Sequence, residues 1–132
     1  MTGKTPYQIE TRQPNAMWMT AVFGDFATTG KIKSTLPKGA VVLGCTYVIN
    51  TAFNQASTAT ISIGTNGPNT CTNIAAATTV AAATTTRVAT ATVTTMTADT
   101  DVYLKVSGTG TAGTTGSATV VLEYVVDPTL YQ

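Results

Sequence analysis

The segment Ala40–Phe53 reads AVVLGCTYVINTAF and is the longest apolar run in the chain. Alternate residues of a β-strand point to the same face of its sheet. Here one alternating set is the more apolar, and we expect it to face a core: Val41, Leu43, Cys45, Tyr47 and Ile49. Gly44, in the other set, is expected to mark a bulge or a close approach of another chain segment. The run therefore predicts a long β-strand with one buried face.

The strand pattern extends outward from this run in both directions. Pro37-Lys38-Gly39 predicts a turn before it, since Pro lacks an amide donor and Gly tolerates turn dihedrals. Alternation of apolar and polar residues predicts further strands, bounded by polar or glycine-rich stretches. They are Ala16–Phe23, Phe26–Leu36 (with Ile32 and Leu36 inward, Lys31 and Lys33 in water), Thr58–Gly64 (Ala59, Ile61 and Ile63 inward), Thr86–Met96, Asp101–Ser107 (Val102, Leu104 and Val106 inward) and Ser117–Val126 (Val120, Leu122, Tyr124 and Val126 on one face).

One stretch favours helix. Asn73–Ala83 reads NIAAATTVAAA, in which Ala has high helix propensity and Asn73 is a suitable N-cap. Seven or eight short strands with at most this one short helix predict an all-β protein, an antiparallel β-sandwich of jelly-roll type with about eight strands. A chain of 132 residues allows one such domain. We expect an extended arm over residues 1–15, the sandwich over 16–126 and a short tail over 127–132.

Composition excludes several classes of function. The chain has 31 Thr, seven Lys plus Arg, six Asp plus Glu and no His, and its net charge is +1. Nucleic-acid binding is not expected, because there is no excess of basic residues to contact phosphates. No apolar run approaches the 18 residues of a membrane span, and the polar N-terminus does not resemble a signal peptide. We expect no membrane contact and synthesis in the cytosol.

Catalytic and metal sites are equally poorly supported, and we expect no enzyme activity and no cofactor. Cys45 and Cys71 have no His to complete a zinc site, and they are either a disulfide or two buried thiols. Asp99 and Asp101 are the only closely spaced carboxylates, which favours a hydrated turn over a calcium site. Gly108–Gly113 matches G-x-G-x-x-G, but a Val-rich strand follows it where a nucleotide site needs a helix.

The strand Ala16–Phe23 (AMWMTAVF) differs from the others because both of its faces are apolar. A small monomer can bury only one of these faces, so we expect a partner to cover the other. Exposed aromatic residues in this strand and in the tails also fit a ligand, but a subunit contact is the favoured interpretation. The predicted contact residues are Tyr7, Arg12, Met17, Trp18, Met19, Leu130 and Tyr131.

Four segments together resemble small structural proteins of tailed bacteriophages. They are a proline–glycine turn leading into a strand, Leu36–Gly44 (LPKGAVVLG), the end of that strand, Tyr47–Gln55 (YVINTAFNQ), a second strand ending in glycine, Thr60–Gly64 (TISIG), and the last strand, Gly116–Val125 (GSATVVLEYV). The resemblance extends over about Gly30 to Val126. It consists of strand ends and turns, and it includes no catalytic residues.

This resemblance implies a capsid decoration, or cement, protein. Such a protein would bind the outside of the shell formed by the major capsid protein and stabilise it, as a homodimer or homotrimer. It would be found on the capsid surface of the virion, after assembly in the host cytoplasm. The alternative is a receptor- or carbohydrate-binding module of a phage head fibre or tail, built on the same sandwich.

Overall fold

A computed structural model describes residues 15–55, 57–88, 95–111 and 113–126. These residues form eight β-strands and one short 3₁₀ turn. In chain order the elements are β1 (Asn15–Val22), η1 (Phe23–Asp25), β2 (Lys31–Leu36), β3 (Ala40–Thr51), β4 (Thr58–Gly64), β5 (Ala75–Thr79), β6 (Thr85–Val88), β7 (Thr100–Thr109) and β8 (Ser117–Val126). The predicted arm lies almost entirely outside the described residues, and the predicted tail lies wholly outside them.

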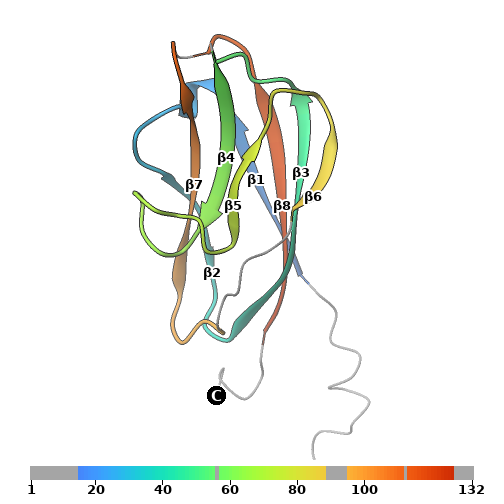
Figure 1. Cartoon of the computed structure of the whole chain (residues 1–132). Helices are drawn as coiled ribbons and strands as arrows, with labels where there is room; N and C mark the ends of the chain where they lie inside the picture. The colour runs from blue at the N-terminus through green and yellow to red at the C-terminus, as the bar shows by residue number, and fades with distance from the viewer. Residues whose placement is uncertain (1–14, 56, 89–94, 112, 127–132) are drawn as a thin grey trace, which may run out of the picture.

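The strands form two antiparallel four-stranded sheets that pack face to face (Figure 1). Sheet A has the order β1-β8-β3-β6, and sheet B has the order β2-β7-β4-β5. The first strand pairs with the last, the second with the seventh, the third with the sixth and the fourth with the fifth. The chain is therefore one long hairpin wrapped into two sheets, which is the jelly-roll arrangement. The prediction of a jelly-roll-like sandwich of about eight strands is confirmed.

The core lies between the sheets and is built from the inward alternations. Sheet A contributes Cys45, Tyr47 and Ile49 from β3 and Ala118, Val120 and Leu122 from β8. Sheet B contributes Ala59, Ile61 and Ile63 from β4 and Val102, Leu104 and Val106 from β7. All of these side chains are buried, as their alternation in the sequence predicts, while Tyr124 and Val126 are partly buried. Leu36, at the end of β2, is also fully buried.

A bulge interrupts the alternation of β3 at Gly44. The pairing of β3 with β8 shifts between Val42 and Gly44, so Leu43 is an extra residue and its side chain is 44% exposed. The expectation that Val41 and Leu43 face the core is therefore wrong, since Val42 packs against the core in their place, whereas the expected bulge is present. A Cβ atom at position 44 would overlap the guanidinium group of Arg87. Glycine at this position thus leaves room for the Arg87 side chain to cross the sheet.

Strand β2 is shorter than predicted and also contains a bulge. Its pairing with β7 shifts between Ile32 and Ser34, and the Ile32 side chain is 55% exposed. The prediction that Ile32 faces inward is wrong, because the extra residue changes which face the earlier part of the strand presents. Lys31 is exposed as predicted and Lys33 is partly buried, and both side chains form ion pairs with Asp25.

The helical turn expected in Asn73–Ala83 is absent, since residues Ala75–Thr79 form β5 at the edge of sheet B. The amide of Ile74 donates to the carbonyl of Ile63 (3.1 Å), and the amide of Val80 donates to that of Ala59 (3.0 Å). Both apolar side chains are buried, so tertiary packing overrides the helix propensity of alanine. Of the strand predicted over Thr86–Met96, β6 covers the beginning, and residues 89–94 lie outside the described residues. No helix among the residues described has the length and apolarity needed to cross a membrane.

Candidate interaction surface

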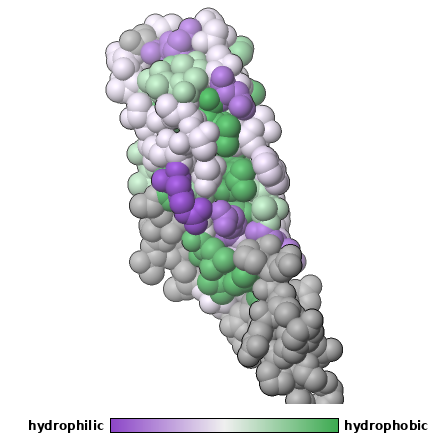
Figure 2. Space-filling view, turned by 90° about the vertical axis from the view of Figure 1, so that its right-hand side faces the viewer, coloured by the Kyte–Doolittle hydropathy of each residue, from purple (hydrophilic) through white to green (hydrophobic). Residues whose placement is uncertain are grey.

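The outer face of sheet A is the side of that sheet directed away from the core. The strand pairing sets one row across it, in which Trp18 lies beside Val121, Val121 beside Thr46 and Thr46 beside Arg87. In a neighbouring row Thr119 lies between Thr20 on one side and Val48 on the other. Figure 2 views the side of the molecule where β3 and β6 lie, and it shows green apolar side chains separated by a few purple hydrophilic ones. The face is mixed apolar and hydroxylic, with few charges.

Strand β1 supplies the most exposed apolar group of this surface. The Trp18 side chain is 68% exposed, and Val22 (39%) and Phe23 (43%) follow it at the end of the strand. Met19, predicted as a contact residue, is only 2% exposed and belongs to the core, because the inward alternation of β1 includes it. Met19 therefore offers no surface to a partner. Met17 is partly buried and packs against the core.

The remaining predicted contact residues, Tyr7, Arg12, Leu130 and Tyr131, lie outside the described residues. The structure does show where the described chain starts and stops. Asn15 pairs with Tyr124, and Ala40 pairs with Val126, so both ends of the described chain lie at the same end of sheet A. Asn15 and Val126 therefore lie at one end of the domain.

One ion pair interrupts the outer face of sheet A. Arg87 on β6 donates to Glu123 on β8 across the bulged part of β3, with 2.9 Å between Nη1 and Oε1. Both side chains are solvent-exposed, so the pair contributes at most about 1 kcal/mol to stability. The pair also neutralises both charges beside the apolar row. Sequence analysis did not identify this pair, since 36 residues separate its members.

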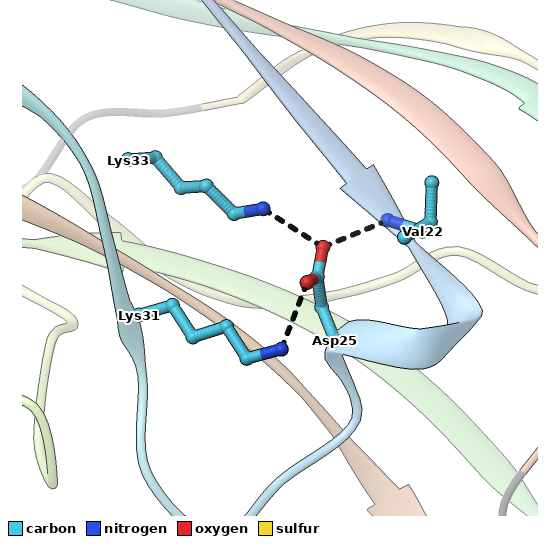
Figure 3. A network of polar contacts seen from close by, with 4 residues as sticks. All are labelled: Val22, Asp25, Lys31 and Lys33. Carbon is cyan, nitrogen blue, oxygen red and sulfur yellow. Dashed lines mark hydrogen bonds and ion pairs between the residues drawn. The ribbon is translucent and has the colours of Figure 1, made fainter.

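A second polar network lies at the lateral edge formed by β1 and β2 (Figure 3). The Asp25 carboxylate accepts hydrogen bonds from Lys31 Nζ (3.1 Å), Lys33 Nζ (3.0 Å) and the backbone N–H of Val22 (3.0 Å). The Asp25 side chain is only 9% exposed. The network therefore ties the end of β1 to the start of β2, and all three ionic groups are used within the chain.

The pKa of Asp25 reflects this environment. Burial alone would raise the pKa, but the hydrogen bonds from Val22, Lys33 and Lys31 and the charge of Lys33 outweigh it, so the pKa of Asp25 lies below its ordinary value of 3.8. The carboxylate is thus held in its charged form. A general acid or base would need a pKa closer to neutrality, and the network has the properties of a structural clamp.

The outer face of sheet B carries hydroxyl groups and a covering loop. Thr58 pairs with Thr109 (3.2 Å) and Thr60 with Ser107 (3.1 Å) through their side-chain oxygens. The loop between β4 and β5 places Cys71 against Ser62, with 3.8 Å between Sγ and Oγ, and both residues are buried. This face therefore presents satisfied hydroxyl pairs next to a closed loop.

The cysteines are free thiols, both of them buried. Burial raises the pKa of the Cys45 thiol to about 12, and the nearby charge of Arg87 lowers it only slightly. Cys45 is therefore a poor nucleophile and metal ligand near neutral pH. Of the two readings that the sequence leaves open, the structure has the buried thiols.

The acidic pair and the glycine motif have structural roles. Asp99 accepts a hydrogen bond from the Lys38 amide (3.0 Å), and Asp101 accepts one from the Thr35 hydroxyl (3.2 Å). The two carboxylates thus serve separate contacts.

The glycine motif Gly108–Gly113 has no helix after it. Gly108 lies within β7, and the described chain after the loop enters β8. Across the described residues, no cluster of three or more His, Cys, Asp or Glu side chains is placed to hold a metal ion.

Comparison with known proteins supplies likeness in fold but not in sequence family. No protein-family model matches the chain, and no curated protein matches it in sequence. Among solved structures, a chain of the cyanophage Pam1 capsid asymmetric unit is 24% identical, with a TM-score of 0.67 over 88% of this chain and 86% of that chain. A chain of the capsid of Ralstonia phage GP4 is 19% identical, with a TM-score of 0.67 over 96% of this chain and 91% of that one.

A third similar chain comes from the acid-stable capsid structure of Helicobacter pylori bacteriophage KHP30. It is 18% identical, with a TM-score of 0.61 over 88% of this chain and 94% of the other. At these identities the three likenesses establish a shared fold. They extend over nearly the whole of each chain, so the common unit is the complete sandwich.

Proposed function

We propose that this protein is a non-enzymatic structural protein of a bacteriophage virion, and that it decorates the capsid. In this role it binds the outside of the shell of major capsid protein and stabilises that shell. The observation that carries the proposal is the shared jelly-roll fold, which matches chains in three phage capsid structures over at least 86% of each of those chains. The sequence resemblance in Leu36–Gly44 and Gly116–Val125 points to the same class of protein independently.

The character of the surface supports a role in assembly. Threonine hydroxyls and aliphatic side chains cover the outer face of sheet A, and its Arg87–Glu123 pair is internally neutralised. Such a face is compatible with water while free, and burying it leaves few charges without partners. Repetition of a contact of about 800 Å² per partner over a symmetric shell would give high avidity without a strong single site.

The proposed contacts include the segments at both ends of the chain. Asn15 and Val126 lie at the same end of sheet A, and Tyr7, Arg12, Leu130 and Tyr131 belong to the sequence segments that adjoin these two residues. We assign these residues and Trp18 to contacts with the capsid or with further copies of the protein, as a homodimer or homotrimer. The proposed location is the capsid surface, reached by assembly in the host cytoplasm.

The test compares complete phage particles with particles made without this protein. Complete particles should release their DNA at a higher temperature and a higher denaturant concentration, and adding purified protein to depleted particles should restore that difference. Imaging of the restored particles should find the protein on the outside of the shell. Equal resistance of the two kinds of particle would refute the stabilising role, and density confined to the tail would refute the proposed location.

The exposed indole of Trp18 favours one alternative, a receptor- or carbohydrate-binding module of a head fibre or tail. Aromatic rings at a surface provide flat apolar platforms for sugars. In that case the isolated protein would bind defined glycans on an array, and Trp18→Ala would abolish the binding. Tyr103→Ala, on the opposite sheet, is the matched aromatic control for such a site.

A further inference from the structure

Strand β1 forms one edge of sheet A, and its free side has an identifiable set of backbone groups. The amide of Phe23 donates to the carbonyl of Gly116, next to the start of β8, at 3.0 Å. The amide of Val22 points the other way and donates to Asp25. Because successive residues of a strand direct their backbone groups to opposite sides, Ala16, Trp18 and Thr20 point their N–H and C=O groups away from β8. Among the residues that the structure describes, no strand of sheet A lies on that side.

Within the described part of the chain, the other three sheet edges carry features that discourage pairing, and β1 carries none of them. The edge strand β2 carries Lys31 and Lys33 and a bulge, β5 has five residues with a shifted register, and β6 has only four residues, including Arg87. Charges, bulges and short length are the usual means by which sheet edges avoid pairing with other chains. Strand β1 has eight residues, pairs with β8 without a register shift and contains no charged residue or proline.

We propose that this edge pairs with β1 of a second copy of the chain, antiparallel and about a twofold axis at Trp18. The two copies of sheet A would then form one continuous eight-stranded sheet. The inference deepens the homo-oligomer part of the proposed function, since it names the surface and the register. Strand addition to an exposed edge is a common mode of recognition, and a twofold axis makes the same patch complementary to itself.

The available amides select the register. Pairing Trp18 with Trp18 of the second copy also pairs Ala16 with Thr20, and this arrangement uses only groups that point outward. Moving the register by one step to pair Trp18 with Thr20 would require the amide of Val22, which the Asp25 carboxylate occupies. In the other direction, the residue before β1 in the sequence is Pro14, which has no N–H to donate. The ladder is therefore limited to the stretch centred on Trp18.

Charge and side-chain size agree with self-pairing. No residue from Asn15 to Gly24 is charged, and Asp25 at the end of this edge is paired with Lys31 and Lys33 of its own chain. The twofold axis consequently brings no unpaired like charges together, and the net charge of +1 opposes association only weakly. On the outer face the two Trp18 side chains would meet between the small residues Ala16 and Thr20, with Val121 of each copy on their far sides.

The first test is the mass of the full chain in solution, measured by sedimentation velocity over a range of concentrations. The expected species is twice the 13.6 kDa chain. Thr20→Pro removes an outward amide while leaving the hydrogen bonds to β8, and it should produce a monomer, whereas the matched variant Thr20→Ala keeps the amide and should remain a dimer. A monomer for the unmodified chain at every concentration would overturn the proposal.

A second variant tests the dimer even if the proline variant does not fold. Trp18→Glu changes an exposed side chain and would place two carboxylates against each other at the twofold axis, so association should weaken more than about tenfold. Unchanged association of Trp18→Glu would show that the dimer uses another surface. These measurements use the isolated protein and test only the dimer. A monomeric protein that still binds depleted particles would refute the dimer and leave the proposed function intact, and a dimer that does not bind the particles would do the opposite.

Cross-linking tests the register directly. Cα atoms of a hydrogen-bonded antiparallel pair are about 5.5 Å apart, which a disulfide can span. Trp18→Cys should therefore form a covalent dimer on mild oxidation, since Cys45 and Cys71 are buried. Thr20→Cys is the matched control, because positions 20 and 20 of the two copies would be more than about 13 Å apart. Efficient cross-linking of Thr20→Cys and none of Trp18→Cys would overturn the proposed register.

Discussion

The phenol of Tyr47, on β3 of sheet A, donates a hydrogen bond of 3.2 Å to the backbone carbonyl of Ile61, on β4 of sheet B. Tyr47 is the largest of the fully buried side chains, with 1% of its surface exposed. Burial raises its pKa far above the ordinary value of 10, so the hydroxyl stays protonated and able to donate. A polar contact thus joins the two sheets within an otherwise apolar core.

Tyr47→Phe should lower the free energy of unfolding by about 1 kcal/mol, because it removes this hydrogen bond and leaves the ring in place. Denaturation by urea, followed by circular dichroism, measures the difference. Tyr103→Phe is the control, since the Tyr103 hydroxyl has no hydrogen-bond partner among the described residues and lies on the outer side of sheet B. Equal losses in the two variants would contradict the role given to the Tyr47 contact.

Asp25→Asn should lower the free energy of unfolding at neutral pH by about 1–3 kcal/mol, because two lysines lose their ionic partner. The variant should also flatten the acid side of the stability profile. The pKa of Asp25 in the folded protein lies below 3.8, so its stabilising effect is complete above that value and is lost as the pH falls through the folded-state pKa.

Urea unfolding between about pH 7 and pH 2 measures this dependence. Asp99→Asn is the control, because Asp99 is exposed and accepts a single backbone hydrogen bond that an asparagine can also accept. If the Asp25→Asn profile ran parallel to that of the unmodified protein below pH 4, the ionised form of Asp25 would not be a source of stability.

Gly116→Ala should destabilise the fold by about 2–4 kcal/mol. Gly116 has a φ of +144°, which L side chains rarely adopt, and an added Cβ would lie 2.5 Å from the ring of the buried Phe53. Thermal unfolding of the variant should therefore begin at a clearly lower temperature. Gly24→Ala is the matched control, since a Cβ there meets nothing within 4 Å, and its melting temperature should stay close to that of the unmodified protein.

Neither native cysteine should react with a thiol reagent at pH 8 while the protein is folded. Both are fully buried, and the raised pKa of Cys45, about 12, leaves almost none of it as thiolate. Colorimetric thiol titration should find two reactive groups per chain only after unfolding. Thr97→Cys, at an exposed position, provides a positive control that reacts in the native state. Rapid native labelling of Cys45 would show that β3 opens locally.

Sequence periodicity predicts the paired core strands well, because burial on one face is a strong constraint on residue type. Ile61, Val102 and Leu104 are buried as the alternation requires. The prediction from periodicity is wrong at Leu43 and Ile32, and the reason is the same at both positions. A bulge inserts one residue and reverses the facing of the strand on one side of it, and nothing in a simple alternation of apolar residues specifies where that insertion occurs.

The candidate surface was predictable only in part. A strand apolar on both faces correctly indicates that Trp18 is exposed, but it does not distinguish Trp18 from its neighbour Met19, which is buried. The clamp between Asp25, Lys31 and Lys33 was not predicted, because it depends on the turn η1 bringing a carboxylate back across the sheet edge. The high helix propensity of alanine also gave a wrong prediction at Ala75–Thr79, because this segment pairs with β4 and forms a strand.

The position of β8 within sheet A has a consequence for how the chain folds during synthesis. β8 is the last of the eight described strands in chain order, and it lies between β1 and β3 and joins them. Until it emerges, β1 has no neighbour, and its apolar residues remain accessible to other nascent chains. Pairing of β1 therefore waits for β8, so folding should be slow, as expected for a topology dominated by distant pairings, and overexpression at low temperature should favour soluble product.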